Sequence, residues 1–187
     1  SKSTKVDPFA SPMSESKPPQ AVVVMGVCGT GKSTIGRGLA DALDCPYADA
    51  DDFHPAANVA KMRSGIALND DDRAPWLDRL RQMMETHLAA GRSIALACSA
   101  LREEYRERLQ PTGHPLRFVF LHGDRELLAQ RMNARADHYM PPELLDSQLA
   151  TLEVPAPSVA LWCDVASTPD EILAAAIDHV RTSPAEA

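Results

Sequence analysis

The chain has 187 residues, 44% of them hydrophobic and 24% charged, which is the composition of a folded globular domain and excludes wholesale disorder. Its 19 Lys and Arg residues against 26 Asp and Glu residues give a net charge of −7, so we expect neither nucleic acid nor a membrane surface as a partner. The longest apolar run, residues 21–25, is far shorter than the ~20 residues of a membrane helix, and the 4 cysteines are widely spaced. These features predict one domain in the reducing environment of the cytoplasm.

The expected elements follow one another in a regular alternation. Residues 1–20, rich in Ser, Lys and Pro, are predicted to be a disordered tail whose first part is a remnant of expression cloning. Residues 21–183 then form the domain, with expected strands at 21–25, 46–48, 93–97, 117–121 and 159–163. Expected helices cover 32–43, 55–63, 73–90, 101–109, 124–135, 142–152 and 169–181. Because the apolar runs do not alternate with polar residues, we predict an α/β fold with a central parallel sheet covered by helices on both faces.

A phosphate-binding loop (P-loop) follows the first expected strand. Residues 26–33, GVCGTGKS, match the pattern G-x-x-x-x-G-K-[ST] between a strand and a helix. The glycines let backbone N–H groups point at phosphate oxygens, while Lys32 adds charge and the Ser33 hydroxyl can bind Mg²⁺. A plain glycine-rich turn is the alternative, but the context favours ATP and Mg²⁺. The predicted nucleotide-binding residues are Gly26, Val27, Cys28, Gly29, Thr30, Gly31, Lys32, Ser33 and Thr34, with Lys32 also catalytic and Ser33 a metal ligand.

Two other classes of P-loop protein do not fit the rest of the chain. A GTPase needs a guanine-reading N-K-x-D motif, which the sequence lacks. A motor ATPase needs acidic residues at the end of a later apolar strand, whereas Cys98 and His122 follow the expected strands 93–97 and 117–121. Small-molecule phosphoryl transfer therefore remains as the predicted chemistry.

Two acids, Asp49 and Asp51, follow the short expected strand 46–48, at the strand end where parallel sheets bind ligands. We expect this strand to lie beside the P-loop strand, and strand alternation to point both carboxylates toward the γ-phosphate of ATP. Asp49 is predicted to hold a water molecule on Mg²⁺, and Asp51 to accept the proton of the attacking hydroxyl. The alternative is a solvated acidic turn that caps the next helix.

Several further segments keep a common order and spacing: residues 49–55 (DADDFHP), 68–77 (LNDDDRAPWL), 98–101 (CSAL) and 152–155 (LEVP). Together with the P-loop they resemble the gluconokinase family over residues 22–180. The resemblance implies a three-layer P-loop kinase fold with a mobile lid, related to shikimate kinase and the nucleoside monophosphate kinases. It also implies ATP-dependent phosphorylation of D-gluconate to 6-phosphogluconate, a step of gluconate catabolism, by a homodimer.

The same resemblance implies the residues of the acceptor site and the lid. Arg131 and Arg135, four residues apart on one helix face, are implied as catalytic lid arginines that reach the ATP phosphates, with Arg131 also binding nucleotide. Plain alternatives stay open: a solvated Lys61, an Arg73 paired with the acids before it, and a structural His54. The implied substrate-binding residues are Asp51, His54, Lys61, Arg73, Ser99, Arg106, His138 and Gln148.

Cys28 stands where the family commonly has Ser. The inward-pointing N–H groups, the helix N-terminus and Lys32 predict a reactive thiolate there, and a buried inert thiol is the alternative. Trp76 and Trp162 are predicted to be core or helix-packing residues.

Two other functions stay open beside gluconokinase. One is a kinase for another small hydroxy-acid such as shikimate, and the other is a non-catalytic protein that senses ATP. Phosphoryl transfer to a panel of sugar acids separates the three.

Overall fold

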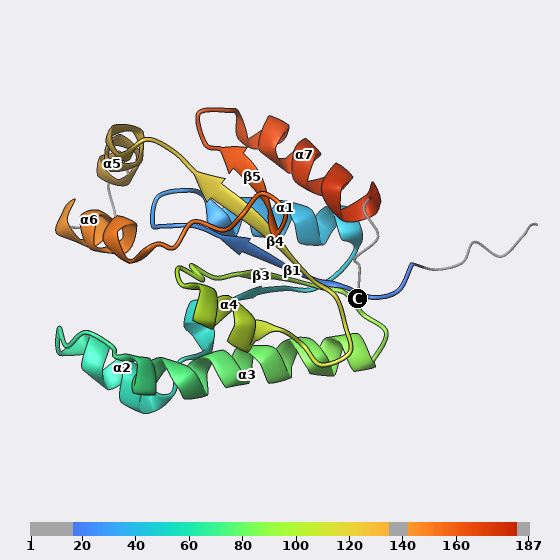
Figure 1. Cartoon of the computed structure of the whole chain (residues 1–187), viewed down its shortest axis with the longest axis horizontal. Helices are drawn as coiled ribbons and strands as arrows, with labels where there is room; N and C mark the ends of the chain where they lie inside the picture. Colours follow the sequence, from blue (N-terminus) through green and yellow to red (C-terminus); the bar gives the residue numbers. More distant parts are fainter. Residues whose placement is uncertain (1–16, 135–141, 183–187) are drawn as a thin grey trace, which may run out of the picture.

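The computed structural model describes residues 17–134 and 142–182, which form three layers with a sheet between two groups of helices (Figure 1). Within these residues the sheet has five parallel strands in the order β2-β3-β1-β4-β5. The strands are β1 (Ala21–Met25), β2 (Tyr47–Asp49), β3 (Ile94–Ala97), β4 (Leu116–His122) and β5 (Ala160–Asp164). The predicted central parallel sheet is confirmed.

Strand β1 lies at the centre of the sheet, and all of its side chains are fully buried. It pairs in parallel with both β3 and β4, so that Val23 lies opposite Leu96 on one side and Phe118 on the other. Val23 faces one helical layer and Val24 faces the other. Burial on both faces explains why this strand has no polar residue.

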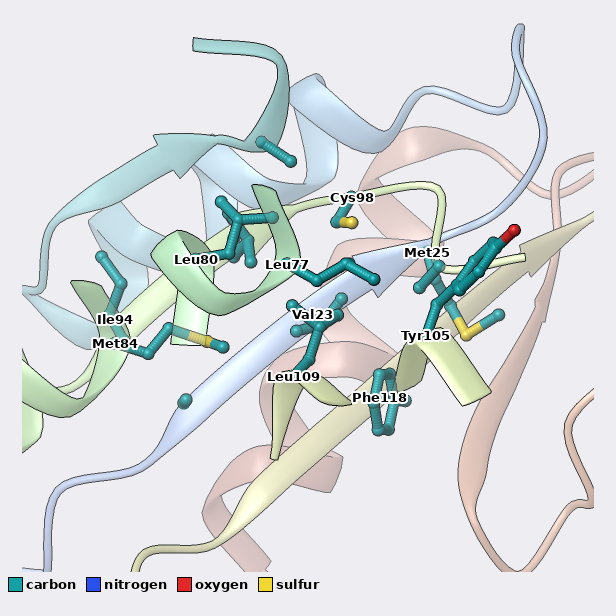
Figure 2. Close-up of a cluster of buried hydrophobic side chains, with 14 of the residues drawn as sticks. Val23, Met25, Leu77, Leu80, Met84, Ile94, Cys98, Tyr105, Leu109 and Phe118 are labelled. Carbon is teal, nitrogen blue, oxygen red and sulfur yellow. The ribbon is translucent and has the colours of Figure 1, made fainter. Parts of the chain in front are cut away.

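Helices cover both faces of the sheet. On one face, α3 (Asp70–Ala89) and α4 (Glu103–Leu109) pack against β1, and Figure 2 shows their Leu77, Leu80, Met84, Tyr105 and Leu109 side chains around Val23. The other face is covered by α1 (Lys32–Leu43) and α7 (Pro169–Thr182), next to α5 (Arg125–Asn133) and α6 (Pro142–Thr151). A 3-10 turn, η1 (Ala50–Phe53), and helix α2 (Ala56–Arg63) follow β2.

Helix α3 begins three residues before its predicted start because a reciprocal cap closes its N-terminus. The Asn69 side chain accepts a hydrogen bond from the Asp72 amide at 2.8 Å, and the Asp72 carboxylate accepts one from the Asn69 amide at 3.0 Å. Such a capping box satisfies two amides that the helix itself leaves unpaired. The acids of residues 70–72 therefore belong to the first turn of the helix.

The strand order differs from the expected one. The neighbour of β2 is β3, so the prediction that the acid-bearing strand lies beside the P-loop strand is wrong. Strand β3 is fully buried, whereas the residues of β2 are only partly buried. The more apolar strand takes the inner position, and β2 lies at the edge.

The predicted tail and one predicted core residue also need revision. Residues 1–16 lie outside the described residues, but Gln20 belongs to the fold, since its amide donates to Ser93 Oγ at 3.0 Å and its side chain to the Val180 carbonyl at 3.1 Å. Trp162 is 42% exposed on the edge strand β5, so its assignment to the core is wrong. In the described part of the chain, no helix has the length and apolar character needed to cross a membrane.

Candidate active site

The P-loop connects β1 to α1 through a backbone that only glycine allows at two points. At Gly26 (φ 150) an added Cβ would lie 2.5 Å from the Leu121 carbonyl oxygen, and Gly31, the residue before α1, has φ 89. The loop therefore turns tightly in front of the N-terminus of α1. Free N–H groups and the helix dipole at such a terminus favour a bound anion.

A cavity of about 290 Å³ opens in front of this loop, at the carboxyl ends of β1, β2 and β3. It brings together ten residues that the sequence predicted for the site, from four separate segments: Cys28, Gly29, Gly31, Lys32, Ser33, Thr34, Asp49, Asp51, Ser99 and Gln148. Its remaining lining residues are Ala50, Trp76, Ala97 and Cys98. Ligands of open parallel sheets bind at this end of the strands.

Lys32 is folded against its own loop. Its ammonium group donates a hydrogen bond to the Val27 carbonyl at 3.0 Å, and the same carbonyl accepts one from the Thr30 hydroxyl at 2.8 Å. Burial lowers the pKa of Lys32, and the carboxylates of Asp51 and Asp49 oppose this shift. The ammonium therefore lies inside the cavity with a weak neutral partner, available to a stronger anionic one.

The two acids meet through a tight turn and not through strand alternation. Asp49 ends β2 and caps η1, because its carboxylate accepts a hydrogen bond from the Asp51 amide at 2.9 Å. Asp51 lies in η1, so the alternation of β-strand side chains does not apply to it. Asp51 is reachable by solvent through the open cavity, yet the surrounding protein raises its pKa, and the nearby Asp49 carboxylate adds to the rise. A carboxylate with a raised pKa is a stronger base than an ordinary one.

The surroundings of Cys28 favour the thiol over the predicted reactive thiolate. Burial raises the pKa of its thiol and outweighs the opposing effect of Lys32. Its Sγ lies 3.6 Å from Met132 Sδ, while its backbone amide donates to the Gln148 side-chain oxygen at 2.7 Å. The neighbouring Cys98 is fully buried, and this raises the pKa of Cys98 to about 12.

On the acceptor side, the predicted cations already have protein partners. His54 stacks on the Trp76 ring with centroids 4.3 Å apart, and burial lowers the pKa of His54, which favours its neutral form. Lys61 Nζ lies 2.8 Å from the Asp72 carboxylate. Arg73 pairs with Asp70 at 3.4 Å and lies over the Tyr105 ring. None of the three predicted residues His54, Lys61 and Arg73 lines the described cavity itself.

Arg106 is not brought to this cavity. It is 7% exposed, and its guanidinium donates to the carbonyls of Ala100 at 2.7 Å and Glu153 at 2.9 Å. Ala100 has the unusual φ of 45, and the preceding Ser99 carbonyl accepts a hydrogen bond from the Gly26 amide at 3.3 Å. Arg106 thus stabilises the strained turn at Ala100, and the preceding residue, Ser99, lines the cavity. It also borders a second cavity of about 610 Å³, which contains none of the predicted phosphate or acid residues.

The predicted lid residues are only partly described. Arg131 lies on α5 and donates to the Val165 carbonyl, while Arg135 and His138 lie outside the described residues.

Sequence reasoning missed Trp76 as a lining residue, although its place four residues after Asp72 on α3 puts it on the same helix face. It also missed Asn58, a buried side chain that donates to the Asp72 carbonyl at 2.9 Å and contacts His54.

Oxygen ligands for a metal are present in the cavity, although no group of three or more His, Cys, Asp and Glu side chains gathers for one in residues 17–134 and 142–182. The Ser33 hydroxyl and the Asp49 and Asp51 carboxylates all line the cavity. These hard oxygen donors fit Mg²⁺, which binds through one or two protein groups together with substrate phosphates and water.

Comparisons with known proteins cover both the P-loop and the acceptor side of this site. Residues 28–156 match the family model for shikimate kinase. The chain is 39% identical over 177 residues to a gluconokinase of Arabidopsis thaliana, covering 88% of this chain and 94% of that one. It is 47% identical over 137 residues to a gluconokinase of Gluconobacter oxydans, covering 73% and 77%. The crystal structure of a gluconokinase from Sinorhizobium meliloti superposes with a TM-score of 0.72 at 40% identity, covering 87% of this chain and 96% of that chain.

The similarity extends well beyond the P-loop. The residues matched by the family model include Lys32, Asp51, Ser99 and Gln148, which line the cavity from four different segments. The predicted three-layer P-loop kinase fold is confirmed by the superposition. With relatives of one kind matched over most of their length, the chain belongs to the gluconokinase family of P-loop kinases.

Proposed function

We propose that this protein is an ATP-dependent gluconokinase, which transfers the γ-phosphoryl group of ATP to a hydroxyl of D-gluconate and releases ADP and 6-phosphogluconate. The observation that carries this proposal is that Lys32 and Asp51 line one cavity. The first supplies a cation for the transferred phosphoryl group, and the second supplies a carboxylate for the attacking hydroxyl. The gluconokinase relatives support the choice of acceptor.

The transfer step follows from these two groups. The acceptor oxygen forms a bond to the γ-phosphorus while the bond from that phosphorus to the β–γ bridging oxygen breaks, and the acceptor proton passes to Asp51. Because the transition state is loose, catalysis rests on positioning and on neutralising charge at the phosphoryl oxygens. Lys32 and the N–H groups of the P-loop perform the second task, joined by the lid arginines Arg131 and Arg135.

The acceptor half is proposed to bind a polyhydroxy carboxylate. Neutral His54, Ser99 and Gln148 suit its hydroxyl groups, and half-exposed Arg73 suits its carboxylate. Lys61 and His138 complete the proposed set. Arg106 is left out of it, because its guanidinium is bonded to two backbone carbonyls outside the cavity.

Mg²⁺ is proposed to accompany ATP. Ser33 would bind the ion, and Asp49 would accept a hydrogen bond from a water molecule on it, since both side chains line the cavity beside Lys32. When bound, the ion neutralises charge on the phosphates.

The test is an ADP-release assay with D-gluconate, shikimate and other sugar acids as acceptors, followed by ³¹P NMR of the product. We expect the highest kcat/KM for D-gluconate and a phosphate monoester on its primary hydroxyl. Turnover with shikimate alone would favour the other hydroxy-acid kinase, and ATP binding without turnover of any acceptor would favour the ATP-sensing protein.

A homodimer in the cytoplasm completes the proposal. Sedimentation velocity at two protein concentrations gives the oligomeric state, with the dimer mass expected at both. A monomer at both concentrations would contradict this part and leave the activity unaffected.

A further inference from the structure

Two hydrogen-bond donors of the P-loop are engaged by the protein's own acceptors. The Cys28 amide donates to the Gln148 side-chain oxygen at 2.7 Å, and the Lys32 ammonium donates to the Val27 carbonyl at 3.0 Å. These are the two kinds of donor that a P-loop offers to phosphate oxygens. A phosphate oxygen bound at the Cys28 amide must therefore replace the oxygen of Gln148.

Gln148 comes from a distant helix whose backbone is well anchored. Leu145 of α6 is fully buried, and Asp146 pairs with the Arg125 guanidinium, with an Oδ2–Nη2 distance of 2.9 Å. At the other end of the helix, the Glu153 amide donates to the Leu101 carbonyl at 2.8 Å. With the backbone held on both sides of Gln148, exchange of its partner requires only rotation of the side chain.

The cavity offers a second partner within the same space. Gln148, Asp51 and Ser99 line one cavity, so a carboxamide that leaves the Cys28 amide remains beside the acceptor half. A carboxamide both donates and accepts hydrogen bonds, which suits the hydroxyl groups of a sugar acid.

We propose that Gln148 occupies a phosphate-oxygen position on the P-loop, is displaced from it by the nucleotide, and then binds a hydroxyl of the acceptor. Nucleotide binding thereby releases an acceptor-binding group, so each substrate strengthens the binding of the other. The acceptor part rests on the proposed function, whereas the phosphate part does not. Gln148 is a binding residue in this scheme and takes no proton.

The chemistry of the side chain explains why a glutamine suits this position. A neutral carboxamide makes an ordinary hydrogen bond, which a charged phosphate oxygen replaces with a stronger one. A carboxylate at the same place would be held by Lys32 and would repel the phosphates. An aliphatic side chain would leave the Cys28 amide to the nucleotide without competition.

The experiment compares Gln148→Glu and Gln148→Leu with wild type by calorimetric titration of Mg-ADP, and of Mg-AMPPNP with and without D-gluconate. Gln148→Glu should weaken nucleotide binding by about tenfold or more. Gln148→Leu should bind nucleotide as tightly as wild type or tighter. Gln82→Glu, the same charge change on the exposed face of α3, is the matched control and should leave nucleotide binding unchanged.

The coupling between the substrates is the second measurement. Wild type should bind gluconate about fivefold or more tightly with AMPPNP bound, and this factor should fall to about 1 in Gln148→Leu. The amide resonance of Cys28 should move in Gln148→Leu, which removes its hydrogen bond, and should move in the opposite direction in wild type with Mg-ADP, which replaces that bond with a stronger one. Thermal melting shows whether each variant is folded.

Three results would overturn the proposal. If Gln148→Glu binds nucleotide as tightly as wild type, Gln148 does not occupy a phosphate position. The same conclusion follows if the Cys28 amide resonance is unchanged in Gln148→Leu. If AMPPNP strengthens gluconate binding in Gln148→Leu as much as in wild type, Gln148 does not bind the acceptor. If wild type turns over shikimate and not gluconate, the proposed function fails, while the Mg-ADP titrations still decide the phosphate part.

Discussion

The two halves of the cavity are built in different ways. The phosphate half comes from one continuous stretch, residues 26–34, whose conformation is set by local glycines and the start of α1. The acceptor half is lined by η1, α3, the turn after β3 and Gln148 of α6. Polar side chains outside the cavity wall bind one another in pairs such as Lys61 with Asp72. The backbone of the first half is therefore set by local sequence, whereas the second depends on side chains brought together from distant segments.

Asp51→Asn should have the largest effect on activity, because it removes the base where the two halves meet. We expect kcat to fall about 10²–10⁴-fold, with Mg-ATP affinity close to wild type. Asp52→Asn is the matched control, since this neighbouring acid does not line the described cavity, and it should turn over normally. A normal saturated rate with lost ATP affinity in Asp51→Asn would place this residue in the phosphate half instead.

The pH dependence sharpens the same assignment. The surrounding protein and the Asp49 carboxylate raise the pKa of Asp51, and only its deprotonated form accepts a proton. The rate should therefore fall as the pH drops through this raised pKa, at a higher pH than an ordinary Asp would give. Asp51→Asn should lose this acidic limb in a kcat-against-pH profile, and a limb that persists would belong to another group.

Lys32→Ala tests the phosphate half. The loss of one charged donor to the transferred group should lower kcat about 10²–10³-fold with the fold intact. Arg79→Ala, which removes an exposed cation on α3, serves as the control and should leave kcat unchanged. Near-normal turnover of Lys32→Ala would contradict the proposed kinase mechanism.

Arg106→Met tests whether the acceptor half depends on buried support outside the cavity. It leaves the Ala100 and Glu153 carbonyls without their buried donor, so we expect a loss of about 3 kcal/mol in the free energy of unfolding. Arg108→Met removes a half-exposed pair with Asp78 and should cost clearly less, because solvent screens an exposed ion pair. Equal losses in urea titrations of the two variants would contradict the supporting role of Arg106.

Trp76→Phe should give the smallest effect. It keeps a ring against His54 but removes the indole hydrogen bond to the Ala50 carbonyl, which measures 2.7 Å. A loss of about 1 kcal/mol should raise the KM for the acceptor about fivefold and leave that for ATP unchanged. A rise in the KM for ATP alone would show that Trp76 belongs to the phosphate half.

Sequence reasoning predicted these two halves unequally. The bounds of β1 and α1 and the conformation of the P-loop follow from contiguous residues, and the structure has them as predicted. The contact between Cys28 and Gln148 joins residues 120 positions apart, and the buried site of Arg106 depends on Glu153 after α6. Such partners are selected by tertiary packing, so a motif identifies the neighbourhood of these side chains but not what they touch. The low-pKa thiolate predicted at Cys28 failed for a related reason, because burial outweighed the nearby charge.

The insertion of β3 between β1 and β2 sets the width of the reaction space. Adjacent strands lie about 4.8 Å apart, so β1, which leads into the P-loop, and β2, which leads into η1, are separated by about 10 Å. Within residues 17–134 and 142–182, Lys32 and Asp51 form no ion pair with each other. Neighbouring strands would bring the ammonium and the carboxylate close enough to neutralise one another. The intervening strand thus widens the gap between the P-loop and η1, the two segments from which Lys32 and Asp51 line the cavity.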